Sequence, residues 1–185
     1  MSSPTATAYT WDDFIALEDD DRRELIDGEL VEVEVPNWRH ERIVAMLCYF
    51  LTGWAKAGHG GDVVASGYKV RISERAGVMP DVQFYRKENV APRSQEKGLV
   101  EGAPDLVVEI ISPSSRRYDR VKKLRYYAGR GVTEYWIVDP YERGVERLVL
   151  RDGTYSINQE SAHDEEVFSP ASFEGLAIPL TELWS

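Results

Sequence analysis

The sequence predicts a mixed α/β fold (α+β) in which helices flank a central mixed β-sheet. Three observations lead to this prediction. Apolar and charged residues alternate with a period of two in several segments, residues 40–57 carry apolar side chains at helical spacing, and residues 106–111 are almost entirely apolar. At 185 residues, we expect a loose lead-in over residues 1–9 and a single domain over residues 10–185.

The composition is that of an ordinary globular domain, with 43% hydrophobic and 29% charged residues. A net charge of −10 argues against a surface coated uniformly with positive charge for nucleic acid, but it permits a local basic patch. The single cysteine, Cys48, excludes an internal disulfide and a cysteine-cluster zinc site. No apolar stretch suits a transmembrane helix and the first residues lack signal-peptide features, so we expect a cytoplasmic protein without membrane partners.

The N-terminal third predicts a short helix, a hairpin and a longer helix. Thr10 can cap a helix whose apolar face holds Phe14, Ile15 and Leu17. The pair Asp27-Gly28 is a tight-turn signal between two strands. Over residues 40–57 one apolar stripe predicts a helix, and its members are Ile43, Val44, Leu47, Phe50, Leu51 and Trp54.

The middle of the chain predicts three strands and one long loop. Residues 68–72 alternate between apolar and basic, and residues 80–85 form a short strand-like run. Residues 86–103 are polar and carry Pro92 and Gly98, which indicates a loop. Residues 106–111 are typical of a central strand that is buried on both faces.

The C-terminal third predicts a helix, a strand and a hairpin around one sheet. The helix runs from about 116 to 130, capped by residues 112–115, and a buried strand follows at 134–138. Strand, helix and strand over residues 106–138 fit a right-handed crossover between parallel strands. Asp152-Gly153 marks a second hairpin, and short strands follow from Val167.

Glu109 is the most informative residue, because an ionised carboxylate inside an apolar strand needs a partner. A lysine, an arginine, a proton or a metal ion could neutralise it, and a structural ion pair fits the strand as well as a functional site does. Asp81 is the better candidate to share a divalent cation with Glu109, because carboxylates on adjacent strands can meet at one point. Asp105 lies roughly 13 Å from Glu109 along the strand, which is too far to chelate the same ion.

Basic residues concentrate in the segment that follows Glu109. Residues 116–130 hold seven of the 22 basic residues and one acid, Asp119. In a chain of net charge −10 this indicates an anionic partner, although a solvated helix face is the structural alternative.

Taken together, these motifs resemble the bacterial Uma-type family of the PD-(D/E)XK nuclease superfamily. The resemblance covers roughly residues 10–183 and rests on Pro80-Asp81, Pro104–Ser114, Lys123–Tyr127 and Glu134–Pro140, with Glu24–Glu29 and His40 also matching. It implies a restriction-endonuclease-like core with an N-terminal and a C-terminal hairpin. It also implies a Mg²⁺-dependent endonuclease for which Mn²⁺ can substitute. Duplex DNA is the expected substrate, and a homodimer is possible by analogy.

The resemblance assigns site residues one by one. Asp81 and Glu109 take the two acidic positions, while Ile111 stands where the superfamily has its lysine, so the resemblance moves that role to Lys123. Asp81, Glu109 and the carbonyl of Ile110 would hold the metal. Glu29 and His40 are additional candidates. The residues expected to hold the nucleic-acid backbone are Arg116, Arg117, Arg120 and Lys122.

Two other functions fit the same features. The displaced lysine and the low isoelectric point favour a catalytically degenerate module that binds nucleic acid or protein. A metal-dependent hydrolase of another phosphoester is the third reading. The chain lacks G-x-S-x-G and nucleotide-binding glycine motifs, and His40, His59 and His163 lack zinc spacing.

Overall fold

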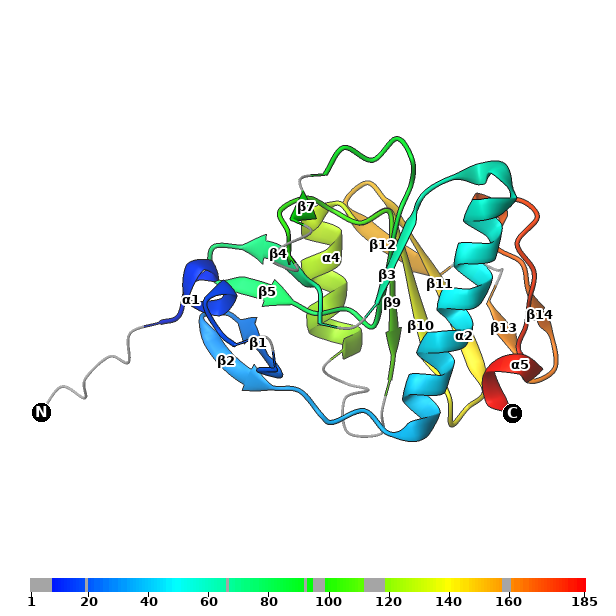
Figure 1. Cartoon of the computed structure of the whole chain (residues 1–185), viewed down its shortest axis with the longest axis horizontal. Coiled ribbons are helices and arrows are strands. Elements are labelled where there is room, and N and C mark those ends of the chain that lie inside the picture. The colour runs from blue at the N-terminus through cyan, green and yellow to red at the C-terminus, as the bar shows by residue number, and fades with distance from the viewer. Residues whose placement is uncertain are drawn as a thin grey trace, which may run out of the picture.

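The computed structural model describes residues 8–18, 20–65, 67–91, 93–94, 99–111, 119–157 and 161–185. Over these residues the protein is a mixed α/β fold, as predicted, but its strands form two large sheets and a small third sheet instead of one (Figure 1). The prediction of a single sheet was therefore wrong. The reason for this error is that periodicity identifies strands but does not show which strands pair with one another.

The six-stranded sheet has the order β2-β1-β5-β4-β8-β7. Its strands are β1 (Arg23–Ile26), β2 (Glu29–Glu32), β4 (Lys69–Ser73), β5 (Ala76–Val78), β7 (Arg93–Ser94) and β8 (Leu99–Val100). The N-terminal hairpin β1–β2 is confirmed, and its turn residues Asp27 and Gly28 have φ values of 53° and 87°.

The seven-stranded sheet has the order β12-β11-β10-β9-β6-β3, and β13 also pairs with β11. Its strands are β3 (Asp62–Ala65), β6 (Val82–Tyr85), β9 (Leu106–Ile110), β10 (Glu134–Asp139), β11 (Gly144–Arg151), β12 (Thr154–Ile157) and β13 (Ala162–His163). β9 and β10 are parallel as predicted, the neighbouring pairs are antiparallel, and the C-terminal hairpin β11–β12 is confirmed.

Helices cover both faces of the seven-stranded sheet (Figure 1). α1 (Trp11–Ile15) begins at Thr10, as predicted, and α2 (Trp38–Trp54) continues as a π-helical turn, η1 (Ala55–His59). The remaining helical segments are η2 (Asp119–Lys123), α4 (Leu124–Arg130), η3 (Ala171–Phe173) and α5 (Thr181–Trp184). Within the described part of the chain, no helix is long and apolar enough to cross a membrane.

The predicted long loop at residues 86–103 in fact contributes β7 and β8, and three further strands, β3, β5 and β13, were not predicted. Strands of two to four residues are too short to show a clear period. In β5, Gly77 lies so close to α1 that an added Cβ would be 2.7 Å from the Trp11 ring. The proposed cap at residues 112–115 lies outside the described residues.

The core is divided among three hydrophobic clusters. One packs α2 and the C-terminal segment, including β14 (Val167–Phe168) and β15 (Ile178–Pro179), on one face of the seven-stranded sheet. A second lies between the two large sheets and includes Tyr127 of α4. The third joins α1 to the outer face of the six-stranded sheet.

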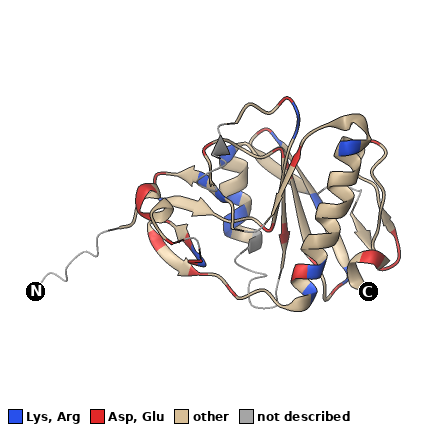
Figure 2. Cartoon of the chain, in the orientation of Figure 1, with Lys and Arg blue, Asp and Glu red and all other residues tan. Residues whose placement is uncertain are grey.

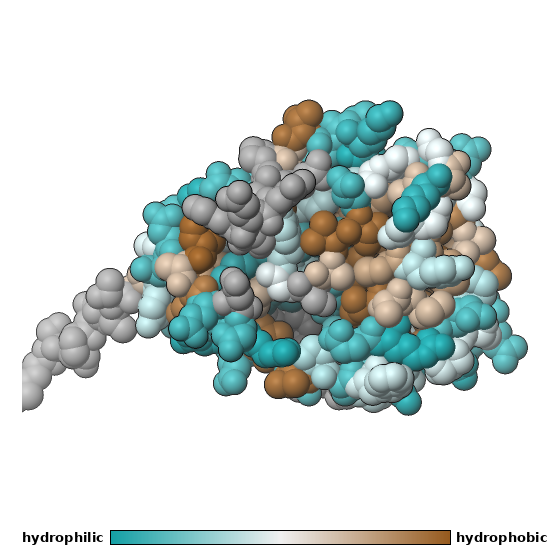
Figure 3. Space-filling view, in the orientation of Figure 1, coloured by the Kyte–Doolittle hydropathy of each residue, from teal (hydrophilic) through white to brown (hydrophobic). Residues whose placement is uncertain are grey.

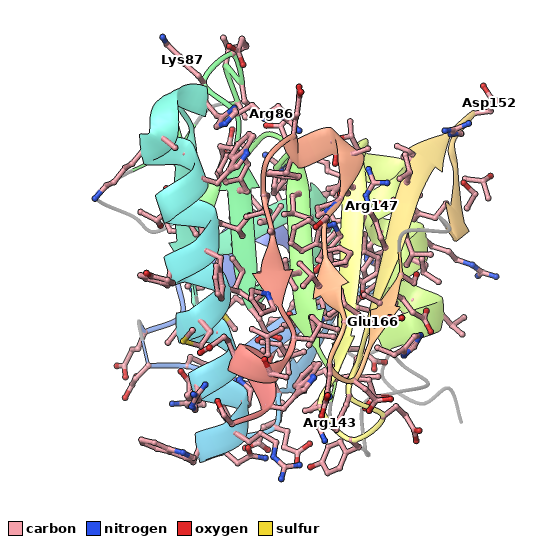
Figure 4. All side chains as sticks on the ribbon, turned by 90° about the vertical axis from the view of Figure 1, so that its right-hand side faces the viewer. Arg86, Lys87, Arg143, Arg147, Asp152 and Glu166 are labelled. Atoms are coloured by element: carbon pink, nitrogen blue, oxygen red, sulfur yellow. The ribbon has the colours of Figure 1, made fainter. Side chains whose placement is uncertain are left out.

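A buried ion pair fastens the C-terminal segment to the sheet. Arg147 donates to both carboxylate oxygens of Glu134, at 2.7 and 3.0 Å. The same carboxylate accepts from the Trp136 indole and the Ser172 hydroxyl, and Arg147 also donates to Ser172 at 2.9 Å. Figure 4 shows Arg147 directed from β11 toward the C-terminal segment in front of the sheet.

Replacing Arg147 by Met is expected to lower the free energy of unfolding by about 3–5 kcal/mol, because Glu134 would remain buried without its cation. Urea denaturation measures this difference. Adding Glu134→Gln should recover part of the loss, since a neutral amide still accepts from the Trp136 indole. An Arg147→Met protein as stable as the wild type would contradict this account.

Candidate active site

The candidate site lies at one end of the seven-stranded sheet, where β9 and β10 finish and β6 begins. Val138 of β10 is opposite Ile110 of β9, and Val82 of β6 is opposite Val108. Asp81 directly precedes β6, so it lies at the same end of the sheet as Glu109 and Ile110. The predicted acidic positions are thus next to each other in the strand order.

The Asp81 carboxylate is held between β9 and the start of α2. Its Oδ2 accepts a hydrogen bond from the Ile110 backbone N–H at 2.7 Å, and its Oδ1 lies 3.1 Å from His40 Nε2. The Asp81 side chain remains 20% exposed. Solvent can therefore reach this carboxylate while its orientation is fixed.

His40 lies in the first turn of α2, where Asn37 caps its backbone N–H at 3.1 Å. Burial is the largest single influence on the pKa of His40, and it lowers that pKa. The hydrogen bonds and negative charges of Asp81 and Glu41 together outweigh burial, so the pKa of His40 is raised above its ordinary value of 6.5. The structure therefore brings His40, one of the additional candidates, into contact with Asp81.

Glu109 is almost completely buried, at 4% exposed. Alternation along β9 turns Val108 and Ile110 toward α2, and turns Val107 and Glu109 toward α4. There Glu109 Oε1 accepts from Lys123 Nζ at 2.9 Å and from the Tyr127 hydroxyl. The buried Glu109 carboxylate is therefore paired with Lys123, the lysine that the family resemblance indicated.

Lys123 lies between two carboxylates from different sheets. Its Nζ is 2.9 Å from Glu109 Oε1 and 3.5 Å from Glu24 Oε1, and all three side chains are buried. Glu24 also accepts from the Met79 backbone N–H at 2.8 Å. Lys123 ends the π-helical turn η2, so helix, hairpin and central strand meet at its ammonium group.

Tyr127 is the fourth member of this buried group. Burial is the main cause that raises the pKa of its hydroxyl well above 10.0, and the negative charge of Glu109 raises it further. The hydroxyl therefore keeps its proton and donates a hydrogen bond to Glu109. Tyr127 is one helical turn beyond Lys123, which places both on the same side of the helix.

Glu24 is a site residue that the sequence reasoning missed. The acidic candidate chosen from this region, Glu29, is exposed at the start of β2, opposite Ile26, whereas Glu24 faces the second sheet from β1. The alternation of side chains along the strand could have indicated Glu24, because Glu24 lies on the same face as the apolar Ile26. Choosing between the two acids required knowing which face of the hairpin is covered.

Asp81 and Glu109 are the residues that could hold a divalent cation. In the part of the chain that the structure describes, His, Cys, Asp and Glu side chains form no metal-binding group of three or more. Mg²⁺ is commonly bound through only one or two carboxylates, with water and substrate phosphate completing its ligands. Glu109 belongs to β9, and Asp81 is hydrogen-bonded to the backbone N–H of Ile110, the next residue of the same strand. These two carboxylates match that donor chemistry.

The predicted nucleic-acid contacts are only partly described. Arg116 and Arg117 lie outside the described residues, and only the backbone of Arg120 is described, in η2. Lys122 is about half exposed, and its Nζ donates to Asp27 Oδ2 at 3.2 Å. Figure 2 shows further basic residues along α4, beside the six-stranded sheet.

Asp27 links the hairpin turn to the helix that carries Lys123. It accepts from Lys122 and, at 2.8 Å, from the Tyr126 hydroxyl. The hydrogen bonds from Tyr126 and then Lys122 are the main causes that lower the pKa of Asp27 below 3.8. This contact fixes β1 and the helix relative to each other one residue away from Lys123.

Replacing Asp27 by Asn is expected to lower the free energy of unfolding by about 1 kcal/mol or less, because Asp27 is 66% exposed and solvent screens its charge. Since folding lowers the pKa of Asp27, its contribution is present above 3.8 and is lost as the pH falls through the folded-state value. Urea denaturation from pH 7 to pH 3 should show the two proteins converging at low pH. A difference that does not change with pH, or an equal effect of Glu29→Gln, would contradict this role.

Comparison with known proteins identifies both family and fold. The family model Uma2, described as "Putative restriction endonuclease", matches residues 11–181. Among solved structures, the chain is similar to the crystal structure of a "putative nuclease belonging to DUF820" from Anabaena variabilis, with a TM-score of 0.76 and 19% identity. That similarity covers 95% of this chain and 97% of the other. No curated protein matches the chain.

These comparisons agree with the observed fold. The crystal structure supports the fold alone at this identity, while the family model, whose description is "Putative restriction endonuclease", spans nearly the whole chain. The resemblance inferred from the motifs around Asp81, Glu109 and Lys123 is therefore confirmed, and the chain belongs to the Uma2 family.

Proposed function

We propose that this chain is a metal-dependent endonuclease that hydrolyses phosphodiester bonds in nucleic acid, with DNA as its substrate. The observation that carries the proposal is the group at the end of β9. Asp81 is bonded to Ile110, and Glu109 lies 2.9 Å from the Lys123 ammonium group. Two carboxylates and a lysine beside one strand end are the functional groups that such hydrolysis requires.

Asp81 and Glu109 would hold a magnesium ion, with the backbone carbonyl of Ile110 as a further oxygen ligand, and manganese would substitute. When bound, the ion supplies charge neutralisation at the scissile phosphate and lowers the pKa of a water nucleophile. His40 holds the Asp81 carboxylate in place through its Nε2, and the Tyr127 hydroxyl does the same for Glu109.

Lys123 would act on the substrate phosphate. Its ammonium group would stabilise the negative charge that develops during hydrolysis, or position the attacking water. Glu24 and Glu109 both contact this group, which fixes its location inside the protein. Glu24 is thus a positioning residue for Lys123.

The basic segment that follows β9 would hold the phosphate backbone. Arg116, Arg117, Arg120 and Lys122 supply this positive charge in an acidic chain. Cleavage of both strands of a duplex would need two sites, which a homodimer would supply. The family description and the fold support a nuclease in general terms.

Replacing Glu109 by Gln, or Asp81 by Asn, is expected to abolish Mn²⁺ binding and reduce DNA cleavage to its level without added metal. Titration calorimetry with Mn²⁺ measures binding independently of any substrate. Glu29→Gln is the matched control, because it removes an exposed acid from the same protein and should leave both measurements unchanged. A wild-type protein that binds no Mn²⁺, with or without DNA, would favour a degenerate nucleic-acid-binding module.

Replacing Lys123 by Met is expected to reduce cleavage by roughly 10²–10³-fold, the usual cost of removing one charge-stabilising group. Mn²⁺ affinity should not fall, because the variant keeps both carboxylates. Lys122→Met is the control, since it removes the neighbouring ammonium from a half-exposed pair and should cost far less activity. Circular dichroism checks folding, and a well-folded Lys123→Met protein with full activity would exclude this role.

A further inference from the structure

The long helix α2 has an apolar side that the described part of the chain leaves exposed. Residues 43–55 of α2 and η1 contain no charged side chain, although 29% of the chain is charged. One side of this run is buried, whereas Tyr49 is 69% exposed and Ala45 and Gly53 are exposed as well. In Figure 3 the surface over the middle of α2 is largely tan to pale, and teal side chains lie toward its two ends. A helix that is apolar all round is typically buried, so the exposed side indicates a protein partner.

The exposed side of α2 carries a regular series of residues. Their spacing alternates between four and three positions, which places them in one line along a helix. We call this line the α2 seam, and its members are Trp38, Arg42, Ala45, Tyr49, Thr52 and Lys56. Trp38, which is 84% exposed, and Tyr49 are its two large rings, and they lie about three turns apart. The seam has the spacing along which two helices pack against each other.

We propose that the α2 seam binds the α2 seam of a second copy of this chain, with the two helices antiparallel. A twofold axis midway between Ala45 and Tyr49 brings Ala45 to the partner's Tyr49, so that a small side chain faces a large ring. The same axis brings Trp38 to the partner's Lys56, and an indole ring attracts an ammonium group. Parallel helices would instead place Arg42 and Lys56 each against its own copy, which like charges disfavour.

The distribution of charge favours a second copy as the occupant. Each copy carries a net charge of −10, so two copies repel each other wherever acidic surfaces meet. Glu41 is the single acid of α2, and Arg39 and Arg42 lie beside it, so this helix is a surface on which two acidic chains can approach. An anionic lipid surface is a poorer partner, because it repels a chain of this net charge. The proposal goes beyond the nuclease function and does not depend on it.

Sedimentation velocity of the full chain tests the proposal over a wide range of concentrations, without metal or nucleic acid. The wild type should approach twice the single-chain mass of 21.0 kDa. Ala45→Glu and Tyr49→Lys should each lose the dimer, because the twofold axis would bring two unpaired charges into the contact. Ala57→Glu is the matched control, since Ala57 is exposed in η1 beyond the seam and its variant should still dimerise. Circular dichroism checks that each variant is folded.

An equal mixture of Ala45→Glu and Tyr49→Lys distinguishes this pairing from any other contact. In the antiparallel register the new carboxylate of one copy meets the new ammonium group of the other, which is a favourable charge pair. The second contact between Ala45 and Tyr49 is unchanged in such a mixed dimer. The mixture should therefore regain the dimer that each variant alone has lost.

A wild type that stays monomeric at every concentration, or a dimer that persists in both single variants, would overturn the proposal. A mixture of folded variants that stays monomeric would overturn the antiparallel pairing. A monomeric wild type that binds anionic phospholipid vesicles, with binding lost in Ala45→Glu, would assign the face to a lipid surface instead. Because these measurements contain no metal or substrate, a failure here leaves the nuclease proposal to its own experiments.

Discussion

The contact of Lys123 with Glu109 and Glu24 is the interaction on which the rest of the structure depends. Its three side chains come from a helix, the central strand of one sheet and a hairpin of the other, and all are buried. Any one of these charges left alone in the interior would cost several kcal/mol. The two sheets must therefore approach each other in the one arrangement that satisfies all three.

The Asp81 carboxylate, beside β9, has more open surroundings than Glu109. Asp81 is bonded to the backbone next to Glu109 and to His40 of α2, yet it remains partly exposed. One carboxylate is thus enclosed with a lysine and a tyrosine while the other is accessible at the sheet edge. Asp81 is thus the more accessible of the two carboxylates beside the end of β9.

The sequence predicted the elements that have strong local signals. The apolar stripe predicted α2, the turn residues predicted both hairpins, and the run around Glu109 predicted a central buried strand. It did not predict the second sheet or the short strands in residues 86–103. Pairing of two-residue strands is a long-range property, and no periodicity records it.

For the site, the sequence by itself determined that Glu109 needs a partner, because its apolar neighbours bury it whatever the details of the fold. Only the tertiary structure decided that Lys123 and Tyr127 supply that partner, that His40 holds Asp81, and that Glu24 rather than Glu29 joins the buried group. The physical reason is that burial of a strand residue follows from its immediate neighbours in the chain. The identity of a contact follows from which faces of distant segments are packed together.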